Sequence, residues 1–234
     1  MSAPGKRVAI VQSSYIPWKG FFDMTSRVDE LILYDDVQFT RRDWRSRNRI
    51  KTPQGLLWLS IPVETKGNYL TPIKDMQVSD PAWNAKHWKT MQSHYARAPF
   101  FPQYREQLEE LYLGCTTTSL SQINHRFIAT LCSWLGIATK LTWSMDYRLD
   151  PGKTERLTSL CAQAGANHYL SGPSARDYIE PDVFERAGIQ LEYMNYAGYP
   201  EYPQLYPPFE HAVSVIDLIL SVGPEAPAFM RPQP

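Results

Sequence analysis

The chain has 234 residues, enough for one large α/β domain or two small ones with a buried core. Basic residues and acidic residues both number 24, so the overall charge gives no argument for a nucleic-acid or membrane partner. No apolar run approaches the roughly 20 residues that span a bilayer.

The first predicted unit is a strand, a turn, a helix and a second strand. The apolar run Val8 to Val11 predicts a buried strand, and Pro17 with Gly20 marks the turn. The run from Glu30 to Tyr34 predicts the second strand. Such a short connection favours a right-handed crossover between parallel strands. Ligands of such sheets bind beyond the carboxyl ends of the strands, so we expect the site there.

Polar and aromatic side chains follow both strand ends. The expected binding residues after the first strand are Gln12, Tyr15 and Trp18, and the expected catalytic residues after the second are Asp35, Asp36 and Gln38. The alternative is structural, because acidic pairs in such loops often cap a helix or hold a turn.

The most basic stretch of the chain comes next, at residues 40–51. Its arginines include Arg47 and Arg49, beside Trp44 and Asn48. Guanidinium groups suit phosphates and carboxylates, and an indole face stacks on a base or a sugar ring. We expect this stretch to reach the same cleft, and a solvated basic loop is the alternative.

Residues 56–63 predict another buried strand, and residues 73–78 a short one. Asp80 and Pro81 then predict the start of a helix that runs to about Tyr95. Two histidines of that helix lie seven residues apart, about 10.5 Å along the axis, which is too far for one zinc ion. The sequence therefore predicts no metal site.

Further helices are predicted over residues 104–113 and 118–135, so residues 81–136 read as a helical insertion. Three widely spaced cysteines form neither a disulfide framework nor a zinc pattern. Cys115 precedes a helix, and we favour a packing role for it over a nucleophilic one.

Alternation of strands and helices then resumes. The predicted strands are 138–144, 168–170 and 189–193, and the predicted helices are 153–164, 181–187 and 213–221. The loop from Ser171 to Tyr178 has small residues and hydroxyls that let a backbone approach a ligand. Residues 195–209 are rich in tyrosine and proline, and form either a wall of the cleft or structural covering. We expect one α/β domain over residues 1–234 with a mostly parallel, Rossmann-like sheet and a proline-rich tail at 224–234.

No Walker motif, GxGxxG or GxSxG is present, so no cofactor is assigned and it stays unknown. The apolar run near the N-terminus is too short for a signal peptide, and Gln12 ends it. We therefore expect a cytoplasmic protein.

Five blocks in order along the chain resemble the WbqC-like protein family. They are Gln12 to Phe22, Asp35 to Phe39, Trp44 with Arg47 to Lys51, Tyr169 to Gly172, and Ser214 to Leu218. One departure is Ser13, where the family usually has proline after the glutamine.

The resemblance implies a bacterial protein of surface-polysaccharide (O-antigen) gene clusters, in a family that lacks a general assigned reaction. Amino sugars of such polysaccharides often carry acyl or aminoacyl groups, so acyl transfer is the activity we expect. The layout of the first unit also resembles the nucleotidylyltransferase superfamily, whose turn bears an HxGH motif. Trp18 and Phe21 would take the histidine positions here.

Three hypotheses follow. The first is an enzyme that acylates the amine of a nucleotide-linked sugar or another phosphate-bearing small molecule. The second is a degenerate nucleotidylyltransferase-like enzyme, or one that takes its acyl group from a charged tRNA. The third is a non-catalytic carbohydrate-binding or assembly protein.

In the first hypothesis Asp36 or Asp35 is the general base that removes a proton from the amine. Gln38 and Asn48 donate hydrogen bonds to the oxyanion or to sugar hydroxyls. The other expected roles are diphosphate binding by Arg47 and Arg49 and ring stacking by Trp44 or Tyr15. Ser171 and Tyr178 complete the expected binding site.

Overall fold

The computed structural model of the protein describes residues 5–65 and 70–231, and within them lie seven α-helices and two β-sheets. The larger sheet contains β1 Arg7–Val11, β2 Glu30–Leu33, β5 Lys140–Trp143, β6 His168–Ser171 and β7 Gln190–Tyr193. The smaller sheet contains β3 Arg47–Thr52 and β4 Gly55–Ser60. The helices are α1 Lys19–Ser26, α2 Trp83–Tyr95, α3 Phe101–Leu113, α4 Leu120–Trp134, α5 Thr154–Gln163, α6 Pro181–Arg186 and α7 Val215–Val222.

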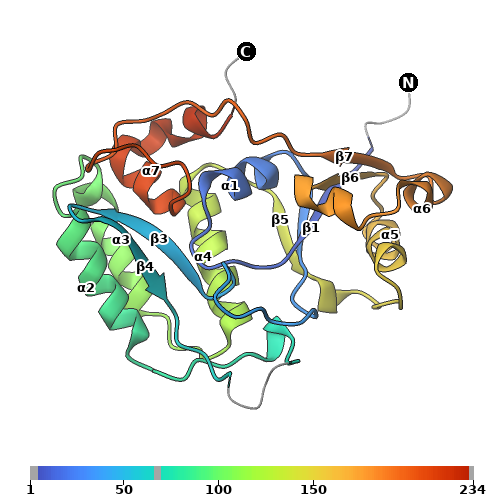
Figure 1. Cartoon of the computed structure of the whole chain (residues 1–234), viewed down its shortest axis with the longest axis horizontal. Coiled ribbons are helices and arrows are strands. Elements are labelled where there is room, and N and C mark those ends of the chain that lie inside the picture. The colour runs from blue at the N-terminus through green and yellow to red at the C-terminus, as the bar shows by residue number, and fades with distance from the viewer. Residues whose placement is uncertain (1–4, 66–69, 232–234) are drawn as a thin grey trace.

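The larger sheet has the strand order β5-β2-β1-β6-β7, and its four pairings are all parallel (Figure 1). The chain passes from β1 to β2 in one direction along the sheet and from β6 to β7 in the other. The boundary between β1 and β6 is therefore a topological switch point, where such sheets bind ligands. This confirms the predicted α/β fold with a mostly parallel sheet and parallel first strands.

Both faces of this sheet are covered, because successive strand side chains point to opposite sides. On one face Ala9 and Leu31 join a core that includes residues of α1, α4 and α7. On the other face Val8 and Ile10 join a core with α5 and α6. Figure 1 shows these two groups of helices on either side of the strands. The near-continuous apolar runs of β1 and β2 are what such a two-sided burial requires.

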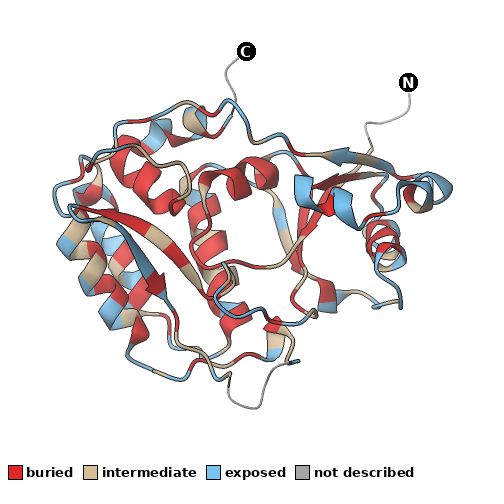
Figure 2. Cartoon of the chain, viewed as in Figure 1, coloured by how far each residue is buried: buried red, intermediate tan, exposed pale blue. Residues whose placement is uncertain are grey.

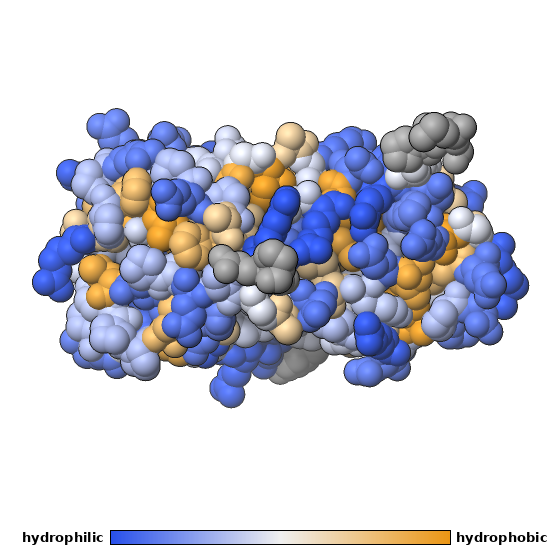
Figure 3. All heavy atoms as spheres, turned by 90° about the horizontal axis from the view of Figure 1, so that it is seen from above, coloured by the Kyte–Doolittle hydropathy of each residue, from blue (hydrophilic) through white to orange (hydrophobic). Residues whose placement is uncertain are grey.

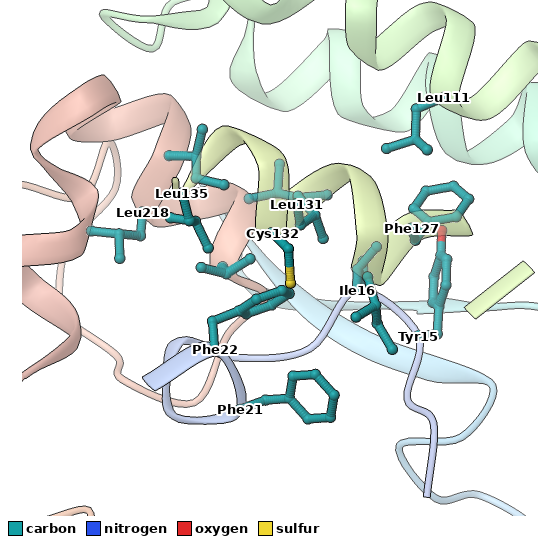
Figure 4. Packing of buried hydrophobic residues seen from close by; sticks show 14 of the residues in the cluster. Tyr15, Ile16, Phe21, Phe22, Leu111, Phe127, Leu131, Cys132, Leu135 and Leu218 are labelled. Carbon is teal, nitrogen blue, oxygen red and sulfur yellow. The ribbon is translucent and has the colours of Figure 1, made fainter. Parts of the chain in front are cut away.

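The predicted helical insertion is confirmed, since α2, α3 and α4 lie between β4 and β5. Figure 4 shows how α1 packs on it, with Phe22 beside Cys132 of α4. The start of α2 is later than predicted. Asp80 accepts a hydrogen bond from the backbone nitrogen of Ala82 at 2.9 Å, so Asp80 and Pro81 form a turn before the helix.

The second sheet corrects two expectations. Residues 47–52, most of which belong to the basic stretch expected to reach the cleft, form β3 and pair antiparallel with β4. The strand predicted at 56–63 exists as β4, but it is not buried, because the hairpin stands outside the main sheet (Figures 1 and 2). Leu56, Leu57 and Trp58 are 37–40% exposed, and only Leu59 is in the core.

The short strand predicted at 73–78 is wrong as well. Ile73–Asp75 is one turn of 3-10 helix, closed by a hydrogen bond from the backbone nitrogen of Met76 to the carbonyl of Ile73. Only isolated bridges follow it, from Gln77 to Ser119 and from Val78 to Val63. These bridges hold the segment against the insertion without extending a sheet.

The surface mixes residue types. On the face shown in Figure 3, hydrophobic groups are interleaved with hydrophilic residues. Among the described residues no helix has the length and apolar character needed to cross a membrane.

Candidate functional site

A cavity of about 980 Å³ lies at the carboxyl ends of β1 and β6, at the switch point of the sheet. Gln12 follows β1, Ser171 ends β6, and the loop after β6 forms part of the wall. The beginnings of α1 and α5 supply Trp18 and Arg156. The location is the one that the parallel topology predicts.

The loop after β1 is strained. Ile16 has a φ of +38°, which is rare for a β-branched residue and costs about 1–3 kcal/mol. Asn48 holds this conformation, because its Nδ2 donates to the carbonyl oxygens of Tyr15 and Ile16 at 3.2 and 2.9 Å. Asn48 is buried and lines the cavity, so one side chain links the strained loop to the site.

The indole of Trp18 forms one wall of the cavity and lies close to the backbone of Gly20. A Cβ at Gly20 would lie 2.3 Å from Cζ2 of Trp18, so only glycine fits there. The other edge of the indole meets Tyr196, with 5.1 Å between the ring centroids. Tyr196 also lines the cavity, whereas Tyr199 and Tyr202 are buried. The tyrosine-rich segment therefore forms part of the cavity wall through Tyr196 and covers the protein core through Tyr199 and Tyr202.

Three basic side chains line the cavity, namely Arg45, Lys153 and Arg156. Among the described residues that line it, none is aspartate, glutamate, histidine or cysteine. Arg45 donates to the carbonyl of Gln12 at 3.0 Å, and burial lowers the pKa of its guanidinium, which stays charged. The charged residues of the lining are therefore all basic, and the carboxylates of Asp36 and Asp43 pair with two of them from outside the lining.

The tyrosines of the lining are neutral hydrogen-bond donors. Burial raises the pKa of Tyr34, Tyr169 and Tyr178 above the ordinary value, and raises that of Tyr196 to about 12. None of them carries a negative charge at neutral pH. Phenol groups and guanidinium groups together suit an anionic ligand with several oxygen atoms.

The structure brings together half of the residues predicted from the sequence. The predicted residues that line the cavity are Gln12, Trp18, Trp44, Asn48, Ser171 and Tyr178. The predicted residues that do not line it are Tyr15, Asp35, Asp36, Gln38, Arg47 and Arg49.

Tyr15 points away from the cavity into the hydrophobic core. It is completely buried, and Figure 4 shows its ring beside Phe127. Its hydroxyl lies 2.8 Å from Nδ1 of His87, on α2 of the insertion. The strained turn at Ile16 separates Tyr15 from its neighbours on the cavity side. Ring stacking on a ligand, expected for Tyr15, is therefore not available to it.

Asp35 is also completely buried. Its carboxylate accepts hydrogen bonds from the backbone nitrogen of Ser13 at 2.9 Å and from the hydroxyl of Ser121. Burial raises the pKa of Asp35, although these hydrogen bonds act in the opposite direction. The carboxylate joins the loop after β1 to α4, beneath the cavity lining.

Asp36 lies next to the cavity without lining it. One carboxylate oxygen accepts from the hydroxyl of Ser144, and the other lies 3.1 Å from Nη1 of Arg156. Arg156 also donates through Nε to the carbonyl of Asp150 at 2.7 Å. Both oxygens of Asp36 are thus engaged, and Asp36 fixes a guanidinium that does line the cavity.

The remaining predicted residues face other surroundings. Gln38 is exposed and forms an isolated bridge with Pro72. Arg47 and Arg49 lie on the outer face of the hairpin, against the ring of Trp58. Both arginines therefore lie away from the strand ends of the main sheet and do not line the cavity. The sequence pattern gives no sign of this separation.

Sequence reasoning missed Arg45, Lys153 and Arg156. A signal for two of them was present, because Gly152, Lys153 and Arg156 stand where a helix begins after a strand. Such helix beginnings border the ligand crevice of a parallel sheet and favour anions. No comparable signal marks Arg45 among its neighbouring arginines.

Metal ligands and reactive thiols are not gathered in the site. Within the described ranges no three His, Cys, Asp or Glu side chains are grouped to hold a metal ion. All three cysteines are buried. Burial raises the pKa of Cys115, and raises those of Cys132 and Cys161 to about 12. A thiolate nucleophile is disfavoured at each of them.

Comparison with known proteins gives one family and one relative. The WbqC-like protein family matches residues 12–229 of the chain. The uncharacterized protein Rv1507c of Mycobacterium tuberculosis is 48% identical over 226 residues, which cover 97% of this chain and 98% of that protein. No solved structure matches the chain.

Proposed function

Because the chain belongs to the WbqC-like protein family, we propose that it acts in the synthesis of surface polysaccharide or of a related small molecule. In this proposal the cavity binds a nucleotide-linked amino sugar or another phosphate-bearing small molecule. The protein then transfers an acyl or aminoacyl group to the amine of that ligand. We place the activity in the cytoplasm, where the nucleotide-linked sugar would be met.

One observation carries the proposal. Arg45, Lys153 and Arg156 line an aromatic cavity in which no described lining residue is acidic. A diphosphate needs charge-assisted hydrogen bonds, which guanidinium and ammonium groups supply. The beginning of α5 at Thr154 adds its partial positive charge beside Lys153.

The size and the remaining lining fit the same ligand. A volume of about 980 Å³ is at the upper end of the range for small-molecule sites, as a nucleotide joined to a sugar requires. Trp18, Trp44 and Tyr178 offer ring faces for a base or a sugar. The hydroxyl of Ser171 and the phenols offer hydrogen bonds to sugar hydroxyls.

The proposed transfer needs an acyl thioester or an aminoacyl ester as donor. The amine nitrogen attacks the carbonyl carbon, a carbon–nitrogen bond forms, and the bond from that carbon to sulfur or oxygen breaks. The proton that leaves the nitrogen balances the thiolate or alkoxide that departs. The neutral tyrosine hydroxyls can donate to the oxyanion in between. Asp36 serves in this proposal to hold Arg156, and not as the base.

A second candidate function is binding without catalysis, as in a carbohydrate-binding or assembly protein. It is favoured by the lack of a carboxylate, imidazole or thiol among the described lining residues. The two candidates share the ligand and differ in turnover. Release of free thiol from an acyl thioester, or loss of the ester from an aminoacyl donor, distinguishes them.

The first test is a thermal-shift screen of the whole chain with nucleotide sugars, ATP and acyl-CoA. A ligand at 100 times its Kd stabilises the folded state by about 2.7 kcal/mol. For a chain of this length we expect Tm to rise by about 5–10 °C. If no nucleotide sugar raises Tm, the proposed substrate class is wrong.

The second test uses Lys153→Gln and Arg156→Gln. Each variant removes one charge from the lining, so we expect the shift with a nucleotide sugar to shrink in both. Arg105→Gln is the matched control, because Arg105 is an exposed residue of α3. An equal loss in the control would show that the shift reports overall charge and not the cavity.

A further inference from the structure

The outer face of the β3–β4 hairpin carries two indoles and two guanidinium groups in contact. The ring centroids of Trp44 and Trp58 are 5.3 Å apart, with 37° between the planes. Cζ of Arg47 lies 4.1 Å from the Trp58 centroid. Cζ of Arg49 lies 5.6 Å from Trp58 and 5.7 Å from Trp44. We call these four residues the hairpin platform.

The register of the hairpin produces this arrangement. Arg49 pairs with Trp58, and Arg47 is two residues before Arg49, so all three share one face of the ribbon. The two arginines are therefore about 6.6 Å apart along the strand. The indoles are 39% and 40% exposed, so their outer surfaces are open to a partner. On the opposite face Asn48 and Ile50 are buried.

The charge of the platform is unbalanced. Residues 41–51 contain six basic residues and one acidic residue, in a chain whose total charge is zero. Arg7, Arg27, Arg126, Arg148 and Arg156 each have a carboxylate partner. Within the described residues no carboxylate pairs with Arg47 or Arg49. Arg47 donates through Nη2 to the carbonyl of Arg42, and the buried Nε of each arginine lacks a hydrogen-bond partner. Two guanidinium groups are thus held ready on ring faces without a counter-charge.

We propose that the hairpin platform binds the single-stranded end of an RNA. Unpaired bases stack on Trp44 and Trp58, and Arg47 and Arg49 bind the phosphates between them. Ring faces that alternate with cations along a strand are how proteins bind single strands without reading sequence. This inference rests on the proposed function, because an aminoacyl donor is an ester at an RNA end.

The platform is continuous with the cavity. Trp44 belongs to both, since its ring packs at a tilt against Trp58 and the residue lines the cavity. The backbone oxygen of Trp44 accepts a hydrogen bond at 3.0 Å from Tyr15, in the loop after β1. The terminal ester of an RNA end that stacks on the platform can therefore reach the cavity.

The test measures binding of a short, fluorescein-labelled single-stranded RNA to the whole chain by anisotropy at several salt concentrations. The double variant Arg47→Gln, Arg49→Gln removes two phosphate contacts. We expect weaker binding, and a slope of log K against log salt that is smaller by about 1.4, at about 0.7 for each contact. The double variant Arg105→Gln, Arg186→Gln removes the same charge from exposed positions on α3 and α6 and should bind as the wild type does.

Trp58→Ala separates stacking from charge. It should weaken binding about five-fold or more without changing the salt slope, because it removes a ring and no cation. Its far-UV spectrum and Tm check that the hairpin remains folded. Unchanged affinity in both platform variants would place the RNA elsewhere and overturn the proposal.

Two further measurements keep the outcomes distinct. Vesicles of phosphatidylcholine and phosphatidylserine test a membrane partner, and binding to them but not to RNA would overturn the proposal. The Tm shift of the platform variants with a nucleotide sugar tests the cavity alone and should equal that of the wild type. If RNA binds the platform while no nucleotide sugar raises Tm, the platform stands and the proposed function fails. If the opposite occurs, only the platform fails.

Discussion

Nη1 of Arg156 lies 3.1 Å from the carboxylate of Asp36, a residue 120 positions earlier in the chain. The side chain of Asp36 is 4% exposed and that of Arg156 is 27% exposed, so the pair is shielded on one side and open to the cavity on the other. This pair changes the role that the sequence suggested for Asp36. A carboxylate that orients a guanidinium acts on binding, whereas a general base acts on turnover.

Asp36→Asn distinguishes these two roles. The amide keeps the shape but loses the charge that orients Arg156, so we expect the Kd of a phosphate-bearing ligand to rise. The transfer rate at saturating ligand should stay within about ten-fold of the wild type. A general base would instead lose roughly 10²–10⁴ in rate with binding intact. Titration of ligand and single-turnover kinetics give the two quantities separately.

Ser13→Pro tests the one departure from the family pattern. The backbone nitrogen of Ser13 donates to Asp35 at 2.9 Å, and proline has no such donor. Loss of a hydrogen bond to a buried carboxylate should lower the free energy of unfolding by about 1.5–3 kcal/mol. Ser13→Ala is the control, since both variants lose the hydroxyl that contacts Asn124 and Asp35 and only the proline variant also loses the N–H. Equal stability of the proline and alanine variants in urea would contradict this account.

Tyr15→Phe should reduce stability without affecting the cavity. The change leaves Nδ1 of His87 and the hydroxyl of Tyr112 without a partner, at a cost of about 1–3 kcal/mol. Tyr178→Phe is the matched variant in the lining, where 57% of the residue is exposed and little stability should be lost. Chemical unfolding and ligand titration of both variants should show opposite patterns. Weaker ligand binding by Tyr15→Phe would contradict the placement of Tyr15.

His87 predicts a loss of stability as the pH falls below 6.5. Burial lowers its pKa to about 4 in the folded state, against about 6.5 when unfolded. Between these values the unfolded chain binds more protons, so the free energy of unfolding rises with pH in that window. The contribution is ~3 kcal/mol and is fully present above pH 6.5. In His87→Gln, urea unfolding should show a flatter dependence on pH between 6.5 and 4.

Glu30 predicts a second loss of stability, at lower pH. This residue begins β2 and lies at the end of the sheet opposite the cavity. Burial raises its pKa, but hydrogen bonds from Lys6, Tyr147 and Thr142 outweigh burial and bring it to about 2. The unfolded value is about 4.3, so the stabilisation is present above pH 4.3 and is lost as the pH falls toward 2. Glu30→Gln should reduce the pH dependence in this window, where Asp80 and Asp150 also titrate, and leave the His87 window unchanged.

The three cysteines should behave as packing residues. All are buried, and burial raises each thiol pKa, so few thiolates form at neutral pH. We expect a thiol reagent to modify none of them rapidly in the native protein and all three after unfolding. Rapid modification of one native thiol would point to Cys115, and Cys115→Ala would then test a chemical role.

Local patterns were enough to predict most of the strands and helices in order, the parallel first pair and the position of the cavity. An apolar run bounded by turn residues, such as Val8 to Val11, predicts a buried strand from a few consecutive residues alone. The handedness of short crossovers then constrains the topology, and the topology constrains where ligands bind. The sequence therefore predicts Gln12, Asn48 and Ser171 as residues that line the cavity.

Only the tertiary structure decided which polar side chains face the cavity. Tyr15 turns into the core because its hydroxyl forms a hydrogen bond with His87, on the insertion, and Asp36 is occupied because Arg156 arrives from α5. The hairpin likewise turns Arg47 outward onto Trp58. Two of these orientations depend on a partner residue that is distant in sequence. The third depends on the register of β3 with β4, which the composition does not reveal. A sequence pattern reports how much of a residue is buried, whereas the direction of its side chain depends on what is packed beside it.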